Sequence, residues 1–231
     1  MVTYTYSRQY EEGVNSAGAS TTTTSPNTNA GYLNNGFDAA PWRSISGIDR
    51  PHRFTLTALY DLPIGSGRVI GRNLTGVVNK VVSGWQINVI GEMQSGAPTL
   101  APNAVLLSPS AALSPGQQGL DRWFDNSTVA NPRPDGTFAW AVLPPNAFRT
   151  LTVRIPDVRD PAAAQWAFSV FKNMSFNGRV SAQFRVEMFN AFNTPIYGAP
   201  DVGVNSPRFG RITPDQINFP RQTQLGLRLV F

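Results

Sequence analysis

The sequence predicts an all-β, antiparallel fold in which about six long amphipathic strands form a curved partial sheet of a transmembrane β-barrel, with long outer loops. Three observations predict it. Apolar and polar residues alternate with a period of two in several segments, most of these segments run for about ten residues, and the connections between them alternate between long and short. The predicted strands are residues 2–10, 53–62, 84–95, 165–174, 179–190 and 222–231.

The first two strands are predicted near the N-terminus. Residues 2–10 alternate from the second residue onward, like the middle of a strand. In residues 53–62 one face is apolar, and the opposite face carries Arg53, two threonines and Asp61. The apolar face of this second strand consists of Phe54, Leu56, Ala58, Tyr60 and Leu62.

The two central strands differ in the strength of their pattern. In residues 84–95 a face with Trp85, Ile87 and Val89 lies opposite a face with Gln86, Asn88 and Glu92. Residues 165–174 alternate more weakly, because apolar side chains occur on both of their faces. Both segments still have the length that a tilted strand needs to cross a bilayer.

The last two strands alternate strongly. In residues 179–190 the apolar face contains Phe184 and Val186, and the polar face contains Gln183, Arg185 and Glu187. In residues 222–231 one face carries Leu225, Leu227, Leu229 and Phe231. Such alternation is typical of a barrel with a wet lumen and a lipid-facing exterior.

Alternation alone leaves a second architecture open, a soluble antiparallel sandwich with its apolar faces turned inward. The connections favour the barrel. Those at 11–52, 96–164 and 191–221 are long, whereas those at 63–83 and 175–178 are shorter, as in barrels with long outer loops and short periplasmic turns. The long segments are rich in Ser, Thr, Asn, Pro and Gly, which predicts irregular loops that serve binding.

The C-terminal strand ends on an aromatic residue. Leu225, Leu227 and Leu229 precede Phe231 on one face, whereas the ends of soluble proteins usually fray into polar residues. The pattern resembles the assembly signal of bacterial outer-membrane proteins, a final amphipathic strand that closes on Phe. It predicts a chain that the barrel-assembly machinery recognises.

Composition excludes several classes of function. The chain has no cysteine, which excludes disulfide scaffolds and thiol catalysis, and its 20 glycines and 19 prolines are too many for a mainly helical protein. Its formal charge is +5, but the basic residues are scattered singly. This spacing does not indicate nucleic-acid binding, and we assign no partner to the charge.

The sequence does not predict an enzyme, a cofactor or a metal site. His52 is the only histidine, so histidine-based zinc sites and hydrolase triads lack partners. Asp157 and Asp160 flank Arg159 in a segment suited to a turn or a surface ion pair. The acids of the loop 121–135 lack the spacing of an EF-hand calcium loop. The Gly-Ser-Gly at residues 65–67 lacks a Walker lysine and a following helix, which predicts a hairpin turn.

Some side chains of the predicted sheet are candidates for function. Glu92, Gln183, Arg185 and Glu187 lie on polar faces, so we expect them to face the lumen, where they contact a plug or line the solute path. Ordinary wet-face residues are the alternative for each. Aromatic residues near strand ends suit interfacial girdles. These are Tyr60, Trp85, Trp166, Phe176 and Phe231.

Motifs spread over nearly the whole chain resemble one family. They include Asp-Arg-Pro-His-Arg-Phe at 49–54, Gly-Trp-Gln-Ile at 84–87, Phe-Asn-Ala-Phe-Asn-Thr-Pro at 189–195, Arg-Phe-Gly-Arg-Ile at 208–212 and Pro-Arg-Gln-Thr-Gln-Leu at 220–225. In order and spacing the chain resembles the C-terminal β-barrel portion of the TonB-dependent, Oar-like outer-membrane transporters of acidobacteria, proteins that contain a carboxypeptidase-regulatory-like domain.

The resemblance implies a location, partners and a function. The location is the outer membrane of a Gram-negative bacterium, and the complete protein would import a bulky nutrient such as a glycan, a peptide or a metal chelate. The implied partners are outer-membrane lipid, the barrel-assembly machinery, an unknown solute, and the TonB system through a plug that this chain lacks. The alternative function is a soluble β-sandwich adhesion or carbohydrate-binding module.

The resemblance also implies that the chain is incomplete. Six strands are fewer than the roughly eight of the smallest membrane barrels, and an open edge in lipid would leave backbone groups without partners. We therefore expect residues 1–231 to be a C-terminal fragment of one barrel domain, or a truncated reading frame, with the plug and N-terminal domains absent.

Overall fold

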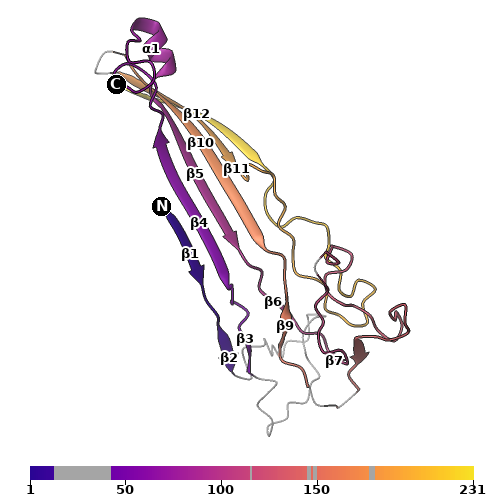
Figure 1. Ribbon diagram of the computed structural model, residues 1–231. Coiled ribbons are helices and arrows are strands. Elements are labelled where there is room, and N and C mark those ends of the chain that lie inside the picture. Colours follow the sequence, from indigo (N-terminus) through magenta and orange to yellow (C-terminus); the bar gives the residue numbers. More distant parts are fainter. Residues whose placement is uncertain (13–42, 115, 145–146, 148–149, 177–179) are drawn as a thin grey trace.

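The computed structural model describes residues 1–12, 43–114, 116–144, 147, 150–176 and 180–231. It confirms the predicted fold class. Six antiparallel strands form one open sheet in the order β1-β4-β5-β10-β11-β12 (Figure 1), with β1 and β12 at its edges. The strands are β1 (Val2–Tyr6), β4 (His52–Asp61), β5 (Trp85–Gln94), β10 (Ala163–Ser175), β11 (Ser181–Phe189) and β12 (Gln222–Val230).

The first predicted strand is interrupted in the structure. β1 pairs with β4 as far as Tyr6 and His52, and a second short strand, β2 (Tyr10–Glu12), pairs with β3 (Arg43–Ile45). The residue before His52 is Pro51, which has no backbone N–H to donate to a ladder. The pairing of β1 with β4 therefore ends before Pro51, and β2 pairs with β3 instead.

The two ends of the sheet differ in the length of their connections, as predicted. At one end, called the short-turn end, lie the connections β4–β5 and β10–β11, together with the C-terminus (Figure 1). The helix α1 (Gly76–Val82) lies in the β4–β5 connection. The sequence did not predict it, because four of its seven residues are valine, which favours strands over helices. No helix in the described part of the chain is long and apolar enough to cross a membrane.

At the opposite end two long connections, β5–β10 and β11–β12, pack together. The described residues of 96–162 and 190–221 are called the loop cap, and the first of these segments contains four short strands. β6 (Pro98–Leu100) pairs with β9 (Arg154–Arg159), and β7 (Ala104–Leu106) pairs with β8 (Trp140–Val142). The described residues of 96–162 are therefore mostly irregular, as predicted, but they include two short two-stranded sheets that the sequence did not predict. Residues 16–29, the Ser/Thr/Asn tract, lie outside the described residues.

The register of the sheet puts the predicted apolar residues on one common face. Paired residues of adjacent strands project to the same side of a sheet. One row, for example, contains Tyr60, Ile87, Val170, Val186 and Leu225. Among the described residues no second sheet covers this face, and the hydrophobic core consists of loop-cap residues. A sandwich needs a core between two sheets, which this arrangement does not provide.

Candidate functional site

The predicted assembly signal lies at one edge of the sheet. Leu225, Leu227 and Leu229 pair with apolar residues of β11, and each is more than half exposed. Phe231 follows the last residue of β12 and is 97% exposed. The four side chains therefore offer an exposed apolar row, and their recognition by the assembly machinery stays a prediction.

An aromatic cluster lies on the apolar face near the loop cap. Trp166 and Phe168 of β10 pack edge-on against Phe192, with ring centroids 6.1 and 5.6 Å apart. Gly91 pairs with Trp166 on the neighbouring strand, and a Cβ atom at residue 91 would lie 2.4 Å from the indole. A glycine at this position thus lets the indole lie across β5. The arrangement suits an aromatic girdle at a membrane boundary.

A lysine sits among the apolar side chains at the short-turn end. Lys172 pairs with Trp85 and Phe184, is 5% exposed, and lies with its ammonium 5.5 Å from the centre of the Trp85 ring. That ammonium donates hydrogen bonds to the carbonyl oxygens of Lys80, at 2.6 Å, and Ser83. The charge is therefore compensated by backbone dipoles at the end of α1.

The remaining girdle candidates at this end lie close to Lys172 or to the strand ends. Trp85 donates its indole N–H to the carbonyl oxygen of Val81 at 3.0 Å. Tyr60 of β4 is exposed, as is Phe176, which follows β10. Sequence reasoning missed Lys172, although a lysine at an apolar position of the alternation was a signal for it.

Three of the four candidate lumen residues lie together on the polar face of β11. Arg185 and Glu187 form an ion pair with a distance of 3.6 Å between Nε and Oε2, and Gln183 donates to Asn173 at 2.8 Å. Gly226 pairs with Arg185 on β12, and a Cβ atom there would lie 2.5 Å from the guanidinium Nε. The glycine thus leaves space for the arginine to extend over β12.

Glu92 shares that polar face but lies apart from the other three. It pairs with Thr55 and Gln165 on its two neighbouring strands. Its carboxylate forms an ion pair with Arg53, with a distance of 2.7 Å between Oε1 and Nη2. Both partners are substantially exposed, so the pair contributes little to stability and leaves charged groups accessible to a solute.

The loop cap is held by a cluster of aromatic rings. Phe124, Trp140 and Phe209 are nearly fully buried, and their rings meet edge-to-face at centroid distances of 5.3 to 6.1 Å. Backbone hydrogen bonds between the two long segments add to this packing, such as Trp123 N–H to the carbonyl of Gly210 at 2.7 Å. The two connections therefore form one folded unit at the end of the sheet opposite to the short-turn end.

Asp125 is the polar centre of this unit. Arg133 donates from Nη2 at 2.6 Å and from Nε at 2.9 Å, Arg122 donates at 3.1 Å, and the Ser127 hydroxyl donates at 2.8 Å. Burial opposes ionisation of this carboxyl, but the hydrogen bonds from Arg133 and Ser127 outweigh it and hold the pKa of Asp125 below its ordinary value. Two arginines thus occupy the carboxylate of this acid of the loop 121–135.

A buried ion pair ties the loop cap to the segment before β4. Asp49 is fully buried, and Arg159 donates to its carboxylate at 2.6 Å. The same guanidinium donates to the carbonyl of Gly96 at 3.0 Å, and the backbone N–H of Gln9 donates to Asp49 at 2.8 Å. Three segments distant in sequence are therefore joined at one carboxylate.

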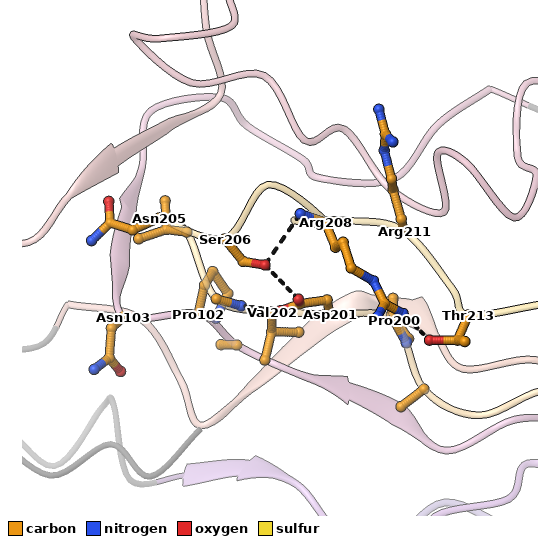
Figure 2. A pocket seen from close by; sticks show the side chains of 14 residues that line it. Pro102, Asn103, Pro200, Asp201, Val202, Asn205, Ser206, Arg208, Arg211 and Thr213 are labelled. Atoms are coloured by element: carbon orange, nitrogen blue, oxygen red, sulfur yellow. Dashed lines mark hydrogen bonds between the residues drawn. The ribbon is translucent and has the colours of Figure 1, made fainter. Parts of the chain in front are cut away.

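Two cavities of about 670 Å³ each open in the loop cap. The first lies between residues 101–103 and 199–213, and the second lies beside Trp140 and residues 126–131. They share Val204, Asn205, Ser206 and Arg211. Figure 2 shows the Ser206 hydroxyl between the Asp201 carboxylate, to which it donates at 2.6 Å, and the backbone N–H of Arg208, from which it accepts at 3.1 Å. Both cavities have mixed polar and apolar walls that include Arg211, which suits a bulky solute with both polar and apolar groups.

The other chemically interesting residues have ordinary structural partners. A ring nitrogen of His52 shares a hydrogen bond with the Tyr4 hydroxyl at 2.8 Å. Asp157 accepts from Ser110, and Asp160 accepts from Thr99 at 2.8 Å while burial raises its pKa. No cluster of three potential metal-ligating His, Asp or Glu residues exists among the described residues.

The Gly-Ser-Gly segment forms a turn, as predicted. Gly65 and Gly67 adopt positive φ angles, and the backbone N–H of Ser66 donates to the side-chain oxygen of Asn79 in α1 at 2.7 Å. The expectation that no helix follows this turn was wrong, because α1 begins nine residues after Gly67 at Gly76. The helix contains Lys80 but no Walker motif, so the turn remains structural.

Comparison with known proteins gives one family. Residues 1–224 match the sequence model of a family described as an outer membrane beta barrel domain. No curated protein matches the chain significantly, and no solved structure does so. The matched range includes all four candidate lumen residues and ends within β12.

Proposed function

Because this chain belongs to the outer membrane β-barrel domain family, we propose that it forms wall and outer loops of a TonB-dependent, Oar-like receptor that imports a bulky nutrient. The family is one of the outer membrane, so the chain is an outer-membrane protein. The imported solute is a glycan, a peptide or a metal chelate. No cofactor and no catalytic step belong to this proposal.

The observation that carries the proposal is the two-sided sheet. Five of its six strands are 9 to 13 residues long, the length that a tilted strand needs to cross a bilayer. One face is apolar and is covered by no second sheet among the described residues, and the opposite face carries charged and amide side chains. A wall between lipid and a water-filled lumen has this composition.

The proposal assigns roles to the two halves of the molecule. The polar face, with Glu92, Gln183, Arg185 and Glu187, lines the path of the solute or contacts a plug from another part of the protein. The loop cap receives the solute at its two cavities. The open edges at β1 and β12 require further strands to close the barrel, because backbone groups without partners are costly in lipid.

The competing function needs a feature that the described residues do not offer. A soluble sandwich module for adhesion or carbohydrate binding would bury the apolar face of the sheet against a second sheet. The family match and the exposed leucines of β12 favour the outer-membrane wall instead. Among its partners we expect outer-membrane lipid, the assembly machinery and the TonB system.

Uptake by cells tests the proposed transport. A strain that lacks the gene encoding this chain is compared with its parent for uptake of labelled glycans, peptides and metal chelates, each with and without a functional TonB. We expect the gene deletion and the TonB deletion to abolish uptake of the same solute. Uptake that survives TonB removal, or recovery of the gene product in the soluble periplasm, contradicts the proposal.

A further inference from the structure

The β4–β5 connection exposes an apolar surface at the short-turn end. Its helix α1 has no buried residue, and Val77, Val78 and Val81 are 76%, 57% and 61% exposed. Successive helix residues are about 100° apart, so these valines fall within one sector of about 100°. A helix of seven residues is not stable in water by itself, which indicates that its surroundings hold it.

The sheet holds α1 on its apolar side. Two residues that project from the apolar face, Trp85 and Lys172, donate hydrogen bonds to carbonyl oxygens at the end of the helix. The Asn79 side chain accepts a hydrogen bond from the backbone N–H of Ser66, so it faces the Gly-Ser-Gly turn at residues 65–67. By the helical period the valine sector lies on the side of α1 opposite to Asn79. Figure 1 shows α1 at the tip of the sheet, beside the C-terminus.

The same connection is basic. Arg68, Arg72 and Lys80 lie within residues 63–83, and that segment contains no acidic residue. All three side chains are exposed. Lys80 lies at the border of the valine sector, with its ammonium 6.0 Å from the centre of the Phe176 ring. An exposed apolar sector flanked by cations is the composition of a helix that lies in a membrane interface.

We propose that residues 63–83 anchor the protein in the phospholipid leaflet at the short-turn end. The valine sector of α1 enters the boundary between headgroups and acyl chains, and the three cations bind the phosphates of anionic phospholipids. Attachment of α1 to the lipid-facing side of the sheet and charge complementarity with an anionic surface carry this proposal. It rests on membership of the outer-membrane family and is independent of the transported solute.

Lipid quenching tests the position of the valine sector. The chain has no cysteine, so Val78→Cys places one environment-sensitive fluorophore on α1. Val129→Cys, which is similarly exposed in the loop cap, is the matched control, and Leu227→Cys reports the apolar face. The protein, together with the strands that close its barrel, is refolded into vesicles of phosphatidylethanolamine with a minor share of phosphatidylglycerol, containing spin-labelled lipid, and is isolated by flotation.

The anchor predicts a definite pattern of quenching. We expect a blue-shifted emission and strong quenching at residues 78 and 227, and neither at residue 129. Quenching at residue 227 without quenching at residue 78 overturns the anchor and leaves the barrel-wall proposal intact. A water-exposed fluorophore at residue 78 that becomes protected only when the protein concentration rises indicates a second copy as the occupant and also overturns it.

Replacement of the three cations tests the recognition of anionic lipid. In the Val78→Cys background, Arg68→Gln, Arg72→Gln and Lys80→Gln are combined, and Arg208→Gln in the loop cap is the control. We expect quenching by spin-labelled phosphatidylglycerol to exceed that by spin-labelled phosphatidylcholine, and the triple replacement alone to abolish this excess. Equal quenching by the two lipids before replacement contradicts the proposed headgroup binding.

Discussion

The most connected residue of the loop cap is Asp125. Its carboxylate accepts hydrogen bonds from two arginines and a serine, and its own carbonyl accepts the indole N–H of Trp140 at 2.5 Å. Loss of a buried charged partner leaves the remaining groups unsatisfied. One residue thereby couples the polar network of the cap to its aromatic core, through its carboxylate and its backbone carbonyl.

Asp125→Asn is expected to destabilise the loop cap by about 2 kcal/mol at neutral pH, because Arg133 loses its counter-charge. Folding lowers the pKa of Asp125, so its ionised carboxylate stabilises the folded state fully above the ordinary carboxyl pKa. This stabilisation is lost as the pH falls through the lowered pKa of the folded state. Urea unfolding followed by tryptophan fluorescence measures the free energy of unfolding of the variant and of the parent. The difference between these two free energies should decrease below about pH 4.

Asp121→Asn is the control for this substitution, because Asp121 is an exposed acid in the same loop. It should change the free energy of unfolding by less than about 0.5 kcal/mol. A destabilisation by Asp125→Asn that stays constant from neutral pH down to about pH 2 would show that the charge is not its cause.

At the scale of elements, β12 combines a regular edge strand with an exposed terminal aromatic residue. Its leucines continue the apolar face of β11 in register, whereas Phe231 lies beyond the last paired residue and is almost completely exposed. Packing within the described residues therefore gives Phe231 no structural role. We propose that it serves in recognition by the barrel-assembly machinery.

Deletion of Phe231 is expected to reduce insertion into the outer membrane severalfold without changing synthesis, because the assembly machinery loses the terminal aromatic residue. The amount of folded, heat-modifiable protein in isolated outer membranes measures the effect. Phe219→Ala is the control, since Phe219 is a similarly exposed aromatic residue, 79% exposed, in the loop cap. Equal insertion of the deletion variant and the parent would refute the signal.

Among the elements, the long strands could be predicted from the sequence, whereas α1 and the short strands of the loop cap could not. The strands were predictable because the pleat alternates side chains between two faces, and a lipid face and a wet face impose opposite chemistry on them. α1 and the short strands of the loop cap carry no such period. They form through contacts with residues distant in sequence, such as the bond from Lys172 to the carbonyl of Lys80.

The whole molecule is polarised along its strands. One end bears the loop cap with its cavities, and the other bears the basic connection 63–83, the β10–β11 turn and the C-terminus. The basic residues of 63–83 place part of the net charge of +5 at the short-turn end. The proposed orientation puts the cap outside the cell and the short-turn end in the periplasm.

Labelling of single cysteines with a membrane-impermeant maleimide tests this orientation in intact cells. Val129→Cys in the loop cap should react at once, and Val69→Cys in the β4–β5 connection should react only after the outer membrane is permeabilised. Both valines are highly exposed, at 67% and 84%, so burial does not explain a difference. The reverse pattern would invert the proposed topology.

The sequence by itself determined the strands, their two faces and the long-short alternation of their connections, because each of these is written in local periodicity and chain length. It also placed Glu92, Gln183, Arg185 and Glu187 on one polar face. Only the tertiary structure decided that Glu92 lies apart from the other three and that Lys172 caps α1. Only the tertiary structure, likewise, showed that Asp49 and Arg159, 110 residues apart, form a buried pair. Such contacts join segments whose distance in space is fixed by the pairing of the strands between them, and no local pattern encodes that distance.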